Sequence, residues 1–147
     1  MADNIGTIIG IDEAKKHEGR TLSVVGDTLQ ILQSGEAFEV FEVAGTVDNG
    51  PPPHAHPWVE SYYGLAGEIE ISASDTTTIL RSGDFISVPA GAVHTFRTLT
   101  QDARFLLMTS GDRASLFFAD IEANVPPSKR MCRPECRPRR ACPPWWK

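Results

Sequence analysis

The sequence predicts an all-β protein built as a sandwich or barrel of short strands. About ten short β-prone runs follow one another, and turn signals separate them at regular spacing. Residues 37–47 alternate so that Phe38 and Val40 share one face of a strand, while Phe41 and Val43 share the other. No long helical period interrupts the pattern. Many short strands with regular turns are typical of a sandwich or a barrel.

Each strand is expected where β-branched and aromatic residues alternate between glycine, proline or aspartate turns. Residues 5–11 are the first β-prone run, and the polar residues 12–19 have room for one helical turn that Gly19 ends. Residues 54–60 are interpreted as a strand that bends at Pro57. The remaining strands are expected at residues 21–26, 28–32, 37–47, 68–72, 76–80, 85–88, 93–98, 104–109 and 115–119.

The chain of 147 residues is long enough for one domain with a hydrophobic core. We expect that domain to span residues 1–125, where 18 acidic residues outnumber 7 basic ones. Such an excess of negative charge disfavours nucleic acid and anionic membranes as partners. No apolar run approaches the roughly 20 residues of a membrane span, so a cytoplasmic location is expected.

Residues 126–147 differ in kind from the rest of the chain. They hold six prolines, seven basic residues and all three cysteines. This composition, without the period of a strand or a helix, predicts an extended, mostly disordered tail. Three thiols without a neighbouring histidine fall short of the four ligands of a structural zinc site. The domain itself has no cysteine and is expected to fold without disulfides.

Two histidines and a glutamate lie within seven positions, and they are candidate metal ligands. His54 and His56 are two apart, so on a strand they project to the same side. Glu60 has the same parity, and His94 follows it 34 residues later, which leaves room for the chain to go out and return. Imidazole and carboxylate suit Fe, Mn, Zn, Ni or Co rather than Cu(I). The plainer alternative is that these are ordinary, partly buried histidines that bind no metal. His17 is expected to be an ordinary surface residue.

These segments resemble the two motifs of the cupin family. The first motif, Gly-x5-His-x-His-x(3 or 4)-Glu-x6-Gly, is matched by His54, His56, Glu60 and Gly67, with Asp48 in place of the leading glycine. The second, Gly-x5-Pro-x-Gly-x2-His-x3-Asn, is matched by Gly83, Pro89, Gly91 and His94, with Thr98 in place of the asparagine. The resemblance implies a double-stranded β-helix (jelly roll) and a homodimer. It also implies a divalent metal inside the barrel, held by His54, His56, Glu60 and His94.

The substrate pocket is expected to be lined by aromatic residues. Phe96 shares the parity of His94, while Trp58 and Tyr62 share that of Glu60. Phe41 and Phe85 are further candidates, and packing in the core or at the surface is the alternative for all five. Aromatic walls, without a cluster of Lys and Arg to hold a phosphate, favour an apolar, planar or polyketide-like small molecule.

The resemblance implies several kinds of activity. A dioxygenase like the quercetinase-like cupins is the leading hypothesis, with Glu60 as a metal ligand or as the general base. A non-redox enzyme, resembling polyketide-cyclase or isomerase cupins, is the second. A binding module without turnover is the third, because one fold carries many functions.

Overall fold

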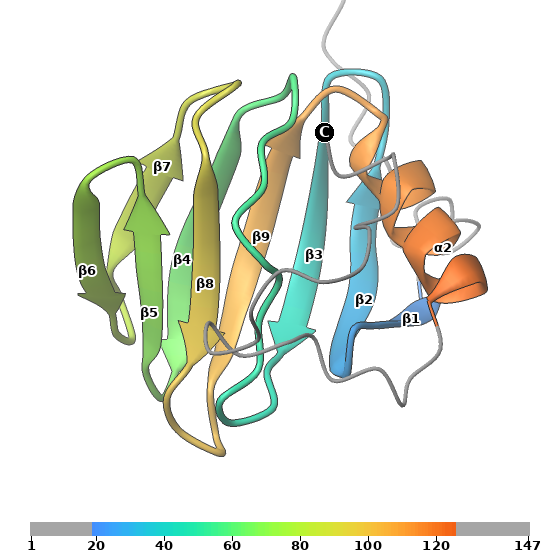
Figure 1. The fold of residues 1–147 in the computed structure, drawn as a ribbon. Coiled ribbons are helices and arrows are strands. Elements are labelled where there is room, and N and C mark those ends of the chain that lie inside the picture. The colour runs from blue at the N-terminus through green and yellow to red at the C-terminus, as the bar shows by residue number, and fades with distance from the viewer. Residues whose placement is uncertain (1–18, 126–147) are drawn as a thin grey trace, which may run out of the picture.

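The computed structural model describes residues 19–125 of the chain, which fold as two antiparallel sheets and one helix (Figure 1). The expected run at residues 5–11, nearly all of the polar segment 12–19 and the tail 126–147 lie outside the described residues. The predicted all-β, double-stranded β-helix architecture is confirmed.

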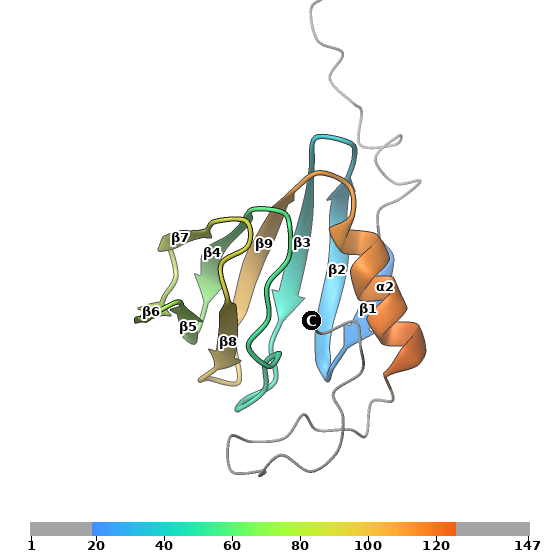
Figure 2. The same cartoon turned by 45° about the horizontal axis from the view of Figure 1, so that its top comes forward.

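The two sheets hold nine strands that pair only in antiparallel fashion. The larger sheet contains, in spatial order, β1 (Thr21–Val24), β2 (Asp27–Ser34), β3 (Phe38–Ala44), β9 (Arg104–Ser110), β4 (Glu60–Ala66) and β7 (Phe85–Val88). The smaller sheet contains β6 (Thr76–Leu80), β5 (Ile69–Ala73) and β8 (His94–Thr98). The connection from β3 to β4 runs beside β8 and carries the two histidines of the first motif (Figure 2).

The core lies on the inward faces that the alternation predicts. On β3 the side chains of Phe41 and Val43 are buried, and they face Leu107 and Phe105 across the pairing with β9. The same inward face also contains Glu39, which is fully buried. A buried carboxylate is costly unless it is hydrogen-bonded, and Glu39 has partners that explain its place.

The expected strand at residues 115–119 is wrong, because these residues belong to α2 (Ala114–Asn124). The run Leu116-Phe117-Phe118 reads as β-prone, and Arg113, at the N-cap, makes no side-chain capping bond. Tertiary contacts supply what the local sequence lacks. α2 lies beside β1 and β2 (Figures 1 and 2), and within residues 19–125 no helix is long and apolar enough to cross a membrane.

Glu39 supplies the missing cap from a distant strand. One oxygen of its carboxylate, Oε2, accepts a hydrogen bond from the backbone N–H of Ser115 at 3.0 Å, and Oε1 accepts one from the Ser34 hydroxyl at 2.7 Å. The first N–H groups of a helix have no partner within the helix and attract negative charge. Near the other end, Glu122 accepts a hydrogen bond from the backbone N–H of Ser23 at 2.8 Å. Both ends of α2 are therefore attached to the larger sheet.

Candidate metal centre

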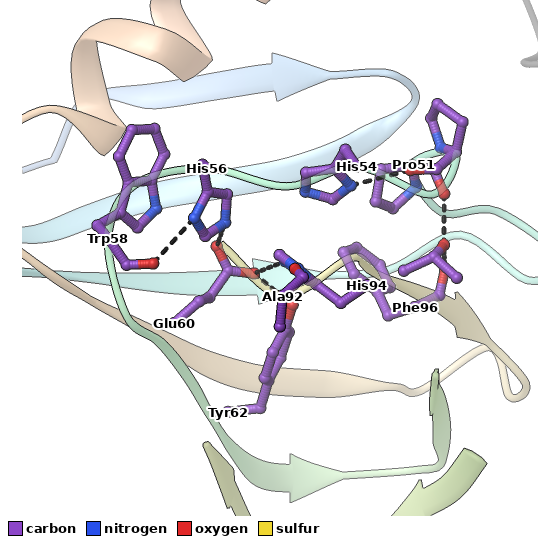
Figure 3. Close-up of polar contacts among 11 residues, drawn as sticks. Pro51, His54, His56, Trp58, Glu60, Tyr62, Ala92, His94 and Phe96 are labelled. Atoms are coloured by element: carbon purple, nitrogen blue, oxygen red, sulfur yellow. Dashed lines mark hydrogen bonds and ion pairs between the residues drawn. The ribbon is translucent and has the colours of Figure 1, made fainter. Parts of the chain in front are cut away.

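Three elements bring the four candidate ligands together. The β3–β4 connection supplies His54 and His56, β4 begins with Glu60, and β8 begins with His94 (Figure 3). The expected strand at residues 54–60 is absent, since His54 makes only an isolated bridge to His94. In that bridge the two backbone N–H···O distances are 3.0 and 2.8 Å. The backbone of β8 thus places His54 directly opposite His94.

The connection reaches this bridge through a tight backbone path. Asp48, which stands where the first motif has glycine, has a φ of 60°, in the left-handed region that aspartate tolerates better than most residues. A Cβ added at Gly50 would lie 1.8 Å from the carbonyl oxygen of Phe96. Asp48 therefore makes a left-handed turn at this position, while Gly50 lets the connection approach β8.

The three imidazoles form a compact, shielded cluster. One ring nitrogen of each of His54, His56 and His94 lies within 4.8 Å of the others. His94 is 2% exposed and His56 is 8% exposed, and Trp58 stacks on the His56 ring at 4.3 Å between centroids. The three ring nitrogens are therefore close enough to hold one metal ion.

A backbone carbonyl orients each of the three rings. The Nδ1 atom of His54 lies 2.9 Å from the oxygen of Pro52, that of His56 lies 3.0 Å from Trp58, and that of His94 lies 2.9 Å from Ala92. A carbonyl only accepts hydrogen bonds, so Nδ1 carries the proton in each ring and Nε2 of the neutral ring carries the lone pair. This pattern of outer hydrogen bonds is the one that metal-binding histidines use.

Glu60 completes the donor set. Its carboxylate lies 2.9 Å from Nε2 of His56 and 3.4 Å from Nε2 of His94, and it accepts a hydrogen bond from the Tyr62 hydroxyl. Burial alone would raise the pKa of Glu60, but the contacts with His56, His94 and Tyr62 lower it further than burial raises it. Glu60 is therefore an anion in this site.

The pKa values of the neighbouring groups follow from the same contacts. Burial lowers the pKa of His54. Burial also acts to lower the pKa of His94, but the interaction with Glu60 outweighs it and raises that pKa. Burial and the nearby Glu60 carboxylate raise the pKa of Tyr62 well above its ordinary value. Tyr62 therefore stays protonated and donates to Glu60.

The donor set fits a divalent transition metal. The Nε2 atom of His94 is buried and makes no hydrogen bond within the part of the chain that the structure describes. Lone pairs of neutral imidazoles that face a carboxylate repel it unless protons or a cation lie between them. Three nitrogens and one carboxylate match Fe(II), Mn(II), Zn(II), Ni(II) or Co(II). His54, His56, Glu60 and His94 would hold such an ion.

The candidate metal centre opens into an apolar cavity of about 50 Å³. Phe96 is the aromatic candidate that lines it, together with Leu107 from β9. The other walls, which the sequence analysis did not identify, come from β1, β2, β3, the β3–β4 connection and α2; they include Val24, Asp27, Leu29, Val43, Pro51, Phe117, Phe118 and Ile121. The β-prone appearance of the α2 sequence hid the aromatic wall that this helix provides.

The other aromatic candidates lie outside the wall of this cavity. Trp58 is half-buried behind His56, and Tyr62 is fully buried behind Glu60. Phe41 is fully buried in the core, where it meets Phe118 edge-on at 5.2 Å. Phe85 is 60% exposed on β7, an edge strand that pairs only with β4, so it points away from the site.

The fold and the histidine cluster are those of a cupin-type domain with three histidines that could hold a metal, and known proteins share this fold. Residues 44–109 match the family model of the cupin domain. The chain is therefore similar to the cupin domain over these residues, and cupin structures share its fold.

Two curated relatives share part of their length with this chain. A quercetin 2,3-dioxygenase from Bacillus subtilis is 29% identical over 86 residues, which cover 57% of this chain and 26% of the dioxygenase. An uncharacterized protein from Streptomyces coelicolor is 34% identical over 67 residues, 46% of this chain and 61% of that protein. The chain thus spans about a quarter of the dioxygenase and less than two thirds of the other relative.

Solved structures share the fold over a larger part of the chain. KdgF from Halomonas sp. has a TM-score of 0.58 and 20% identity, over 62% of this chain and 85% of its own. The polyketide cyclase RemF from Streptomyces resistomycificus has a TM-score of 0.53 and 25% identity, over 63% of this chain and 70% of its own.

Proposed function

We propose that this chain is a metal-dependent dioxygenase that acts on a small aromatic or enolisable substrate. The observation that carries the proposal is the position of three oriented imidazoles and an ionised carboxylate at one end of an apolar, aromatic cavity. The partial similarity to a quercetin 2,3-dioxygenase supports the same class of reaction.

Each residue of the site has its own role in the proposed reaction. A bound divalent metal would supply Lewis acidity and, with a redox-active ion, electron transfer to O2. The histidines orient their Nε2 atoms, and Glu60 stands at the cavity wall as the base that accepts the proton of a substrate hydroxyl. Tyr62 orients Glu60 by its hydrogen bond, and the apolar walls exclude water. Both oxygen atoms of O2 enter the product, so no external reductant is needed.

Metal content and oxygen uptake test the proposal together. Protein purified without a chelator or an affinity tag should contain close to one divalent transition metal per chain, and His94→Ala should lose it. His17→Ala is the matched control, because His17 is the chain's only histidine outside the cluster. The metal-loaded protein should consume O2 in proportion to added flavonol or diketone, and Glu60→Gln should slow this at least about a hundredfold. Turnover that needs no oxygen would contradict the proposal.

A non-redox enzyme is the second candidate, and the 25% identity with the polyketide cyclase RemF favours it. In that case Glu60 moves a proton of an enolisable substrate without oxygen. Zinc as the native metal, with activity under anaerobic conditions, would distinguish this reaction from the first. If the protein bound a small molecule, left it chemically unchanged and showed neither the dioxygenase nor the non-redox activity, it would instead be a binding module.

The location, the oligomeric state and the partners of the protein are also proposals. We expect a cytoplasmic homodimer that binds a small molecule, without nucleic acid or membrane as a partner. The acidic composition of residues 1–125 and the cupin fold support this expectation.

A further inference from the structure

Asp27 is a buried acid in the wall of an otherwise largely apolar cavity. It begins β2, is 3% exposed and lines the same cavity as the metal centre. Its neighbours in that wall are Val24, Val25 and Leu29. A carboxyl group in such surroundings costs free energy unless its oxygens have partners, so each of its two oxygens requires an explanation.

One oxygen of Asp27 holds the β3–β4 connection in place. Oδ1 accepts hydrogen bonds from the backbone N–H of Thr46 and from the side-chain amide of Asn49, each at 2.9 Å. The same amide group of Asn49 donates to the carbonyl oxygen of Val25 at 2.7 Å. The carboxyl group is thereby fixed in direction, and this structural role needs only Oδ1.

The second oxygen remains available to a ligand. Oδ2 of Asp27 accepts no hydrogen bond from the residues that the structure describes, and it is not among their fully buried polar atoms. Burial raises the pKa of Asp27, although the hydrogen bonds from Asn49 and Thr46 act in the opposite direction. The cavity therefore has a second polar position besides the metal centre.

The pairing along β8 separates the two polar positions. His54 pairs with His94, whereas the backbone of Asn49, the residue that holds Asp27, bonds to Thr98. These contacts are four residue steps apart along β8, about 13 Å at roughly 3.3 Å per residue. Phe96 lines the cavity from the middle of this interval. The cavity thus has a metal-binding end, an apolar centre and a carboxyl end.

From this arrangement we infer that Asp27 is a specificity-determining residue that binds a hydroxyl group on the far end of the substrate. The inference rests on the proposed function and names its substrate class. That class is an elongated, planar molecule with a metal-chelating oxygen pair at one end and a phenolic hydroxyl at the other. Oδ2 repels anionic groups, and the apolar walls disfavour a buried cation, so a neutral hydroxyl is the donor that fits best.

The test uses three flavonols that differ only at the ring carbon farthest from their chelating oxygens, which carries hydrogen, hydroxyl or methoxyl. Their affinity for the metal-loaded protein is measured without oxygen, by the change in flavonol fluorescence. The hydroxyl compound should bind at least about tenfold more tightly than the other two, because it alone donates a hydrogen bond to a buried acceptor.

Asp27→Asn is the matched variant. Its amide oxygen can keep both hydrogen bonds with Thr46 and Asn49, while an N–H donor replaces Oδ2, the oxygen that these two residues leave free. In this variant the preference for hydroxyl should fall to within about threefold, and the methoxyl compound should bind more tightly than it does to wild type. Metal content should be unchanged, because Asp27 is not one of the four candidate metal ligands.

The outcomes separate this inference from the proposed function. If the wild-type protein bound the three flavonols with equal affinity, or bound none of them, the inference about Asp27 would be overturned. These two outcomes do not depend on whether Asp27→Asn folds. A hydroxyl preference that survives in a folded Asp27→Asn would also overturn it. A hydroxyl preference that depends on Asp27, in a protein that consumes no oxygen, would support the inference and refute only the dioxygenase.

Discussion

Tyr62 connects the metal centre to the hydrophobic core. Its side chain is fully buried and packs near the rings of Phe96 and Phe105, with centroids at 6.3 and 6.0 Å. Its hydroxyl donates to Glu60, whose carboxylate also contacts two of the histidines. The orientation of Glu60, a candidate metal ligand, therefore depends on Tyr62, which is not itself a candidate ligand.

At this scale we predict that Tyr62→Phe weakens metal binding by about 10- to 100-fold, the usual effect of losing an outer hydrogen bond to a ligand. The ring remains to fill the core, so the free energy of unfolding should fall by only about 1 kcal/mol. Competition with a chromophoric chelator measures the affinity. Tyr63→Phe, at a neighbouring side chain that is 38% exposed, is the control and should change neither quantity. An unchanged affinity in Tyr62→Phe would show that Glu60 needs no orienting partner.

Among the elements, α2 depends on a cap that lies 76 residues earlier in the chain. Removal of the Glu39 side chain leaves the N–H of Ser115 and the hydroxyl of Ser34 without their acceptor, and it opens a void in the core. Phe117, Phe118 and Ile121 of the same helix line the cavity. Loosening of the cap should therefore disturb the wall that α2 gives to the cavity.

We predict that Glu39→Ala destabilises the fold by about 2 kcal/mol or more, since hydrogen bonds to a buried charge are among the stronger ones. The amides of α2 should exchange with deuterium faster than those of β3 and β9. Glu42→Ala is the matched control on the same strand. Glu42 pairs with Arg104 at the surface, with a hydrogen bond of 2.9 Å from Nε, and its loss should cost less than about 1 kcal/mol. Equal effects of the two substitutions would refute the capping role.

For the whole molecule, the metal should contribute to stability because its ligands come from separate parts of the fold. A ligand at a thousandfold its dissociation constant stabilises the folded state by about 4 kcal/mol. In a domain of about 100 residues this corresponds to a rise in Tm of more than about 10 °C. Differential scanning calorimetry with and without a chelator measures the shift. His94→Ala should show almost none, and an equal shift in that variant would place the stabilising metal elsewhere.

Period-two alternation predicted most of the strands but not β4 (Glu60–Ala66), and the four candidate donors that the motif spacing grouped lie close together. The sequence did not predict α2, whose cap comes from Glu39 rather than from a neighbouring residue. The position of a residue in the alternation predicts which face of a strand its side chain occupies, but not how deeply that side chain is buried. Phe41 lies in the core, whereas Phe85 lies at an exposed edge. Asp27 lies between two strands expected from the sequence and was not identified as a cavity residue, since its place there depends on contacts with the distant Thr46 and Asn49.

The match to the cupin family model begins at the last residue of β3 and ends five positions before α2 begins. The metal-binding end of the cavity, at His54, His56, Glu60 and His94, lies inside the matched residues 44–109, whereas Asp27 and the aromatic wall of α2 lie outside them. Two proteins with this family match can therefore inherit the same metal chemistry and still select different molecules. A search for proteins that share this chain's substrate should compare residues 24–29 and 117–121, and not the histidine motifs that define the family.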